Sequence, residues 1–248
     1  MPAGITFSIS RIEQKMCLVD FDPRTRSGNV VVNLTTFEQK RLDEVLSTFR
    51  DVMDAGLAVA PYVKLLGAGD SLDGELIPQG QAGVCTVCSI TVDGALVKAG
   101  IPTRPQLGGT VQVDANRPLR FTDVITYRST TLDPMEMLMS QELTSVLRVV
   151  RTGSGVILAN LREIPYSAYD ETTDLLSRLQ LSGLYGVLEV GEPNTPVLGV
   201  QVGRNHFGVV IVGGTNPMAA LQERGIPAYT RAITATMDFH EFTKVDKL

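Results

Sequence analysis

The octapeptide SGNVVVNL at residues 27–34 recurs as SGVILANL at residues 154–161, an offset of 127 positions. Three further blocks recur in the same order at a similar spacing: 54–57 with 181–184, 92–94 with 212–214, and 100–102 with 225–227. Repetition of this kind is the mark of a duplicated structural unit. The sequence therefore predicts two homologous modules, residues 1–126 and 151–248, joined by a connecting segment over residues 127–150.

Each module is predicted to follow the order β-α-β-β-α-β, so the expected fold is α+β with two tandem ferredoxin-like modules. In the first, apolar runs predict strands at 30–34, 57–66, 84–92 and 109–113, a helix capped by Thr36 and a short helix at 95–99. In the second, they predict strands at 156–161, 185–190, 207–212 and 232–239, a helix at 172–181 and one capped by Asn216. The connecting segment is predicted to hold a helix capped by Asp133, with buried positions as far as Val150.

The composition is that of an ordinary globular protein. Of 248 residues, 44% are hydrophobic and 20% are charged, which is too apolar for a disordered chain. The sequence has no membrane-spanning apolar run and no secretory signal, so a cytoplasmic protein with reduced cysteines is predicted. Proteins that bind nucleic acid usually have a basic face that contacts the phosphates. The net charge of −5 does not indicate such a face, so no direct contact with nucleic acid is predicted.

The search for catalytic motifs yields little. The motifs GxxxxGK[ST], GxSxG and HExxH are missing, and the chain has only two histidines. Cys85 and Cys88 form a CxxC, but a zinc site needs four ligands. Within a strand at 84–92 these thiols would also face opposite sides. Buried, inert thiols are therefore favoured over metal or redox chemistry, and no catalytic residue, metal or cofactor is predicted.

Polar residues on the predicted strand at 84–92 are the first candidates for binding. Ser89, Thr91 and Asp93 would share one face, with Cys88 on the other. Such a face is most often exposed to solvent in an antiparallel sheet. It could instead line a polar pocket between the modules, and Asp93 could simply cap the next helix.

Glycines at strand ends give a second set of candidates. Gly213 and Gly214 precede Thr215 and Asn216 at the start of a predicted helix, where bare backbone N–H groups suit a carboxylate or phosphate. A tight turn that needs positive φ explains them equally well. Gly108-Gly109 raises the same two interpretations in the first module.

Asn160 and Arg162 lie at the end of the first strand of the second module. The fork of Arg162 could hold an acidic ligand through two hydrogen bonds. Arg120 and Arg128 are weaker candidates of the same kind. For each arginine the alternative is a solvated surface charge.

Six stretches together resemble the regulatory domain of the NrpR family, repressors of nitrogen-assimilation genes in methanogenic archaea. They are TVCSITVDG at 86–94, KAGIP at 98–102, RFTD at 120–123, LDPME at 132–136, ILANLREIP at 157–165 and GGTNPMAAL at 213–221. The resemblance extends from about Phe21 to Phe239. It implies a sensor that binds 2-oxoglutarate, after which DNA is released, and the stretch from Cys88 to Asp93 is the nominated effector contact.

Family members often begin with a winged helix that reads DNA, whereas this chain begins directly at the resembling region. The expectation is therefore either a partner of a DNA-binding NrpR-type subunit or a fragment of a longer repressor, in both cases as a homodimer. Two other hypotheses remain open. One is an enzyme acting on a small polar metabolite through Cys88 or Asp93, and the other is an interaction module without a ligand.

Overall fold

The computed structural model describes residues 6–248, so the first five residues of the predicted first module lie outside it. The helices are α1 (Ser8–Met16), α2 (Leu42–Asp54), α3 (Ile90–Lys98), α4 (Pro134–Ser140), α5 (Val146–Thr152), α6 (Tyr169–Ser182) and α7 (Asn216–Glu223). The long strands are β1 (Asn29–Glu38), β5 (Gln81–Val87), β6 (Arg104–Asp114), β7 (Arg117–Thr126), β8 (Gly155–Pro165), β10 (His206–Val212) and β11 (Ala228–Asp238). The shorter strands are β2 (Tyr62–Leu66), β3 (Ser71–Leu72), β4 (Glu75–Leu76), β9 (Val187–Val190) and β12 (Thr243–Lys244).

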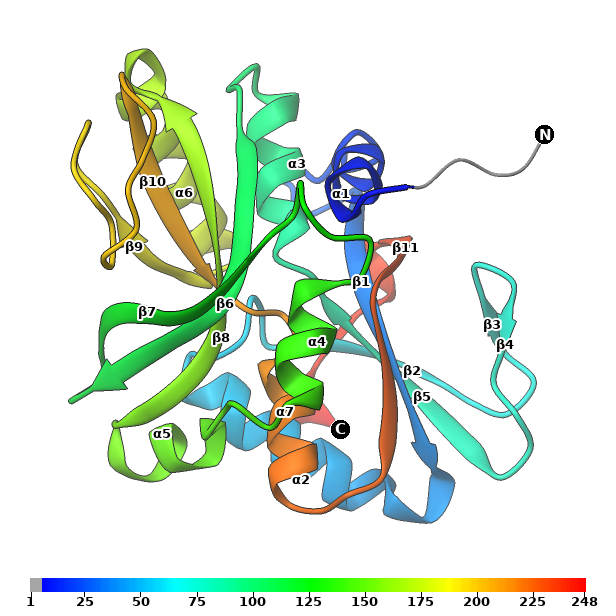
Figure 1. The fold of residues 1–248 in the computed structure, drawn as a ribbon. Helices are drawn as coiled ribbons and strands as arrows, with labels where there is room; N and C mark the ends of the chain where they lie inside the picture. The colour runs from blue at the N-terminus through cyan, green and yellow to red at the C-terminus, as the bar shows by residue number, and fades with distance from the viewer. Residues whose placement is uncertain (1–5) are drawn as a thin grey trace.

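Two antiparallel five-stranded sheets form the centre of the molecule (Figure 1). Their strand orders are β11-β1-β5-β2-β12 and β7-β6-β8-β10-β9. β11 comes from the end of the chain, yet it pairs with β1 of the first half. In the same way β6 of the first half pairs with β8 of the second. The two halves therefore exchange strands.

This exchange differs from the predicted tandem arrangement. The order β-α-β-β-α-β does occur twice, as β1-α2-β2-β5-α3-β6 and as β8-α6-β9-β10-α7-β11, with the β3–β4 hairpin inserted in the first half. Neither 1–126 nor 151–248 contains a complete sheet, however, because each half gives its last two strands to the other: β6 and β7 join β8, and β11 and β12 join the sheet of β1. A common origin of the two halves stays a prediction.

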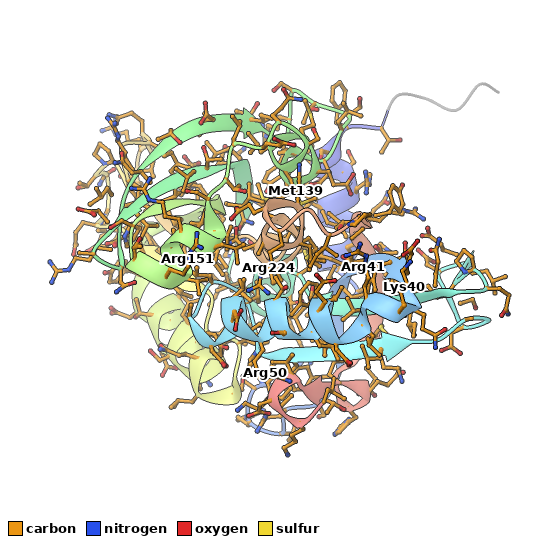
Figure 2. All side chains as sticks on the ribbon, turned by 90° about the horizontal axis from the view of Figure 1, so that it is seen from below. Lys40, Arg41, Arg50, Met139, Arg151 and Arg224 are labelled. Carbon is orange, nitrogen blue, oxygen red and sulfur yellow. The ribbon has the colours of Figure 1, made fainter. Side chains whose placement is uncertain are left out.

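The helices also bridge the halves. α2 of the first half packs against α7 of the second, and α3 packs against α6. Arg224, at the end of α7, lies beside α2 (Figure 2), and its Nη2 is 2.6 Å from Oδ2 of Asp51 on that helix. The larger of the two hydrophobic cores draws residues from both halves, so apolar burial holds them together as one body.

Four predicted boundaries are wrong. The predicted strand at 57–66 begins only at Tyr62, and the other three differ for local reasons. The predicted strand at 84–92 ends at Val87, and α3 begins at Ile90 in place of the short helix at 95–99. Thr36 does not cap a helix, because β1 continues through it to Glu38 between β5 and β11. The connecting helix is two helices, since the backbone N–H groups of Val146 and Leu147 donate to Glu223 on α7 and start α5 afresh.

Candidate functional site

The N-termini of α3 and α7 meet where the two sheets adjoin. α3 follows β5 and α7 follows β10, so both helices start from an inner strand of their sheet. A Cβ added to Gly214 would lie 3.2 Å from Cα of Cys88 and 2.9 Å from Nδ2 of Asn33. Glycine at this position therefore allows the two helix starts to approach closely.

Each helix is fastened to the first strand of one half. Oγ1 of Thr91 lies 3.0 Å from the backbone nitrogen and 3.3 Å from the carbonyl oxygen of Val31 on β1. The amide of Asn216 does the same on β8, where it accepts from the N–H of Leu158 at 2.8 Å and donates to its carbonyl at 3.0 Å. Thr91 and Asn216 thus fix the helices in position and are occupied in doing so.

A small cavity lined by both polar and apolar side chains lies between these helix starts. Its volume is about 10 Å³, which holds roughly one water molecule. The polar side chains that line it come from five segments of the chain: Asn33, Ser89, Tyr127, Asp133, Asn160 and Thr215. Cys88, Gly214 and Ile233 also line it. The cavity therefore draws its wall from both halves and from the connecting segment.

Three buried polar atoms in this wall have no hydrogen-bond partner within residues 6–248: Asn33 Nδ2, Asn160 Oδ1 and Thr215 Oγ1. Buried polar groups are normally paired, and leaving one unpaired costs roughly 1–3 kcal/mol. Of the four such atoms found in that part of the chain, three share this one cavity. Their convergence marks a place where a water molecule or a polar ligand group would be held.

The residues just before the two helices reinforce this interpretation. Ser89 and Thr215 hold the N-cap positions of α3 and α7, but neither side chain caps its helix. Ser89 Oγ instead accepts from Nδ2 of Asn160 at 2.9 Å. Most first-turn N–H groups already donate to the preceding turn: Thr91 to the carbonyl of Cys88, Val92 to that of Ser89, Asn216 to that of Gly213 and Met218 to that of Thr215. What the two helix starts offer the cavity is therefore the positive end of each helix dipole, which favours negative charge.

Asn33 is held by a strained partner on β11. Its Oδ1 accepts from the backbone N–H of Ile233 at 3.1 Å, at a register shift between β1 and β11. Ile233 has φ of +53°, a conformation that β-branched residues rarely adopt. Such strain persists where the surroundings enforce it, often at functional sites.

Asp93 and Arg162 form a buried ion pair beside the cavity. Nε of Arg162 donates to Oδ1 of Asp93 at 2.9 Å and Nη2 to Oδ2 at 2.8 Å, and the side chains are 1% and 0% exposed. The expected two-pronged contact exists, but its acid is Asp93 of the same chain. Arg162 is therefore not a solvated charge, and Asp93 is not a helix cap because it lies inside α3.

Burial changes the pKa of the acid Asp133 and of the thiols Cys85 and Cys88 with different consequences near neutral pH. Burial, and then Glu136, raises the pKa of Asp133 to about 6. Burial also raises the pKa of Cys85 and of Cys88 to about 12, and that of Tyr127 well above its usual range. Both thiols are therefore protonated and poorly nucleophilic at neutral pH.

The structure brings five of the predicted site residues to the cavity: Cys88, Ser89, Asn160, Gly214 and Thr215. The other glycines serve close packing. A Cβ on Gly213 would lie 2.7 Å from Cβ of Leu158, one on Gly108 would lie 2.2 Å from Met135, and one on Gly109 would lie 2.5 Å from the carbonyl of Asp123. Neither Gly213 nor Gly214 has positive φ, so the tight-turn alternative is wrong.

Sequence reasoning missed Asn33, Tyr127, Asp133 and Ile233 as wall residues. The repeat offset of 127 relates Asn33 to Asn160, so that signal was present in the octapeptide. The connecting segment that supplies Asp133 has no such signal. Over residues 6–248 no cluster of three or more potential metal ligands occurs, and no helix is long and apolar enough to cross a membrane.

Comparison with known proteins gives a consistent answer. The family model described as NrpR regulatory domains NRD1 and 2 matches residues 5–244. The global nitrogen regulator NrpRI of Methanosarcina mazei is 39% identical over 96% of this chain and 73% of its own length. Global nitrogen regulator NrpR of Methanococcus maripaludis is 30% identical over 98% of this chain, which spans only 41% of that relative. The crystal structure of a nitrogen repressor-like protein from Methanococcus jannaschii superposes with a TM-score of 0.84 at 25% identity, covering 98% of this chain and all of that one.

Proposed function

Because this chain belongs to the family of NrpR regulatory domains, we propose that it is the effector-sensing part of a nitrogen-responsive transcriptional repressor. We further propose that it binds 2-oxoglutarate at the cavity between α3 and α7. The observation that carries the proposal is the set of three unpaired polar atoms on Asn33, Asn160 and Thr215 at one cavity.

The chemistry of the wall suits a dicarboxylate. The positive ends of two helix dipoles favour carboxylate oxygens, and the unpaired amide nitrogen of Asn33 offers them a hydrogen-bond donor. Two acidic groups on one small molecule match two helix ends that belong to different halves of the chain. A ligand with a single negative charge would leave one helix end unpaired.

Binding requires the cavity to grow. The present space of about 10 Å³ holds roughly a water molecule, so a dicarboxylate must displace the surrounding segments. Those segments belong to both sheets and to the start of α4. Effector binding therefore favours a second arrangement of the two halves, and the differential affinity for the two arrangements supplies the signal.

The signal would pass to DNA through another domain or subunit. We propose that the chain acts in the cytoplasm as a homodimer, and that a winged-helix domain or a DNA-binding NrpR-type partner makes the nucleic-acid contacts. The relatives named regulators extend beyond this chain, which spans about three quarters of one and two fifths of another. Without such a partner, the chain should show no sequence-specific band shift with any operator DNA.

Isothermal titration with 2-oxoglutarate tests the site. Thr215→Val removes only the unpaired hydroxyl and keeps the shape, so stability should stay equal or rise while affinity falls by roughly tenfold or more. Thr172→Val on α6 is the matched control, because its buried Oγ1 bonds only to the carbonyl of Ala168. Unchanged affinity in Thr215→Val, or no heat with wild type at millimolar ligand, would refute the proposal.

A further inference from the structure

Asp133 presents an acid to the same cavity that is proposed to receive a dicarboxylate. Its Oδ1 accepts from the backbone N–H groups of Met135 at 2.9 Å and Glu136 at 3.2 Å, which caps α4. Its Oδ2 accepts no hydrogen bond from residues 6–248, although the side chain is 95% buried and lines the cavity. One oxygen therefore has a structural role, and the other is left for whatever fills the cavity.

An ionised Asp133 opposes an anionic guest. The bound state would hold three negative charges, two from the ligand and one from Asp133, around a residue that is only 5% exposed. The nearest buried cation, Arg162, is already neutralised by Asp93 through two hydrogen bonds. Burial of an unbalanced charge is strongly unfavourable, and a group in that position changes its protonation state first.

The charged and titratable groups around Asp133 come from several elements. Glu136 on α4 raises its pKa and Arg11 on α1 lowers it, while burial raises it most, to about 6. Tyr127 after β7, Cys88 before α3, Asp93 on α3 and Arg162 on β8 complete this electrostatic surrounding. Tyr127 and Cys88 are themselves neutral at physiological pH because burial raises their pKa. Asp133 is thus the group in this surrounding that can take up a proton near neutral pH.

We propose that Asp133 is a specificity-determining residue of the effector site, which takes up one proton when the dicarboxylate binds and donates it from Oδ2 to a ligand oxygen. This inference rests on the proposed function. The protonated carboxyl group of Asp133 donates a hydrogen bond to the ligand, which the ionised carboxylate cannot do. Effector binding then weakens as the pH rises, by roughly tenfold per pH unit above about pH 7.

Calorimetry in buffers of different ionisation enthalpy measures the protons taken up with each ligand. Wild type at pH 7.5 should take up close to one proton per 2-oxoglutarate. Asp133→Asn keeps the cap oxygen and a donor toward the cavity. It should take up none, should bind more tightly than wild type at pH 8, and should show the same affinity from pH 6 to pH 8.5.

Glu136→Gln provides a second variant, should Asp133→Asn fold poorly. Its amide oxygen can still accept from the N–H of Ala232, as Oε1 of Glu136 does at 2.6 Å. Removal of the like charge lowers the pKa of Asp133, so the loss of affinity should begin at lower pH than in wild type. Circular dichroism establishes that each variant is folded before its titration.

The outcomes separate the two proposals. Binding without proton uptake by wild type, proton uptake that persists in Asp133→Asn, or loss of binding in that variant would each overturn the role of Asp133. In those cases the effector site would stand. Lack of binding by wild type and by both variants at every pH from 6 to 8.5 would overturn the effector site itself.

Discussion

The two halves of the chain place an asparagine at corresponding points of β1 and β8 but leave opposite ends of the amide free. Asn33 gives its oxygen to Ile233 and leaves Nδ2 unpaired, whereas Asn160 gives its nitrogen to Ser89 and leaves Oδ1 unpaired. The order of strands and helices is repeated, but one asparagine leaves a hydrogen-bond donor unpaired at the cavity and the other leaves an acceptor. A ligand with two different ends would therefore bind in one orientation, and each structural difference between the halves can be tested separately.

The largest difference is the ion pair between Asp93 of the first half and Arg162 of the second, because the related positions, Gly213 and Thr35, hold no charged side chain. The offset relates Arg162 to Thr35, whose Oγ1 lies 3.0 Å from Oγ1 of Thr230. Asp93→Ala leaves a buried guanidinium unpaired and should lower the free energy of unfolding by about 3–5 kcal/mol in urea titrations. Thr35→Val, which breaks a neutral contact, should cost only about 1 kcal/mol. Equal losses in the two variants would show that the ion pair is not what distinguishes the halves.

The connecting segment is the second difference, since Asp133 has no counterpart after β11. Its pKa is raised from 3.8 to about 6 in the folded protein, so its contribution to stability is full below about pH 4 and is lost as the pH rises through about 6. Asp133→Asn retains the cap and removes this dependence. It should exceed wild type in unfolding free energy by on the order of 2–3 kcal/mol above pH 7. That advantage should shrink as the pH falls from 7 to 4 in thermal or urea unfolding. A constant advantage across this range would contradict the assignment.

The strands that face the two asparagines differ as well. Gly108 on β6 is paired with Asn160, whereas β11 places the strained Ile233 beside Asn33. Gly108→Ala puts a Cβ 2.2 Å from the end of Met135 and 3.0 Å from Cβ of Pro134, at the start of α4. Because the methionine end can move, the expected loss is roughly 1 kcal/mol, at the low end for overpacking. Gly67→Ala meets only Asp70 Oδ2 at 3.8 Å and should change stability by less than about 0.5 kcal/mol. If Gly67→Ala lowered the free energy of unfolding as much as Gly108→Ala, the loss would come from replacing any glycine and not from the contacts of Gly108.

The sequence predicts the individual strands and helices better than it predicts which strands pair with each other. The order of strands and helices follows from apolar runs and glycine stops, and Asn160, Ser89 and Thr215 follow from polar residues placed at strand ends. The strand exchange does not, because the apolar pattern of β6 does not say which of the two sheets the strand joins. The start of α3 was also hidden, since Ile90, Thr91 and Val92 extend a β-branched run past the end of β5. The inclusion of Asp133 depends on where the connecting segment returns to the sheets, which only tertiary packing decides.

The smallest expected effect concerns the thiols. Cys88 and Gly214 each directly precede the N-cap residue of their helix and line the cavity, but only Cys88 has a side chain there. Cys17 is exposed, whereas Cys85 and Cys88 are buried with their pKa raised to about 12. A disulfide reagent at pH 8 should therefore modify one thiol of native protein quickly, and Cys17→Ser should abolish that phase. In Cys17→Ser the remaining slow reaction of Cys88 requires the cavity to open, so 2-oxoglutarate should change its rate while leaving that of Cys85 unaltered, as mass spectrometry of the labelled peptides would show. Rapid modification of both buried thiols would instead indicate an activated cysteine and would favour the enzyme hypothesis over the sensor. A ligand effect confined to Cys88 would tie effector binding to the half of the cavity that carries a side chain at this position.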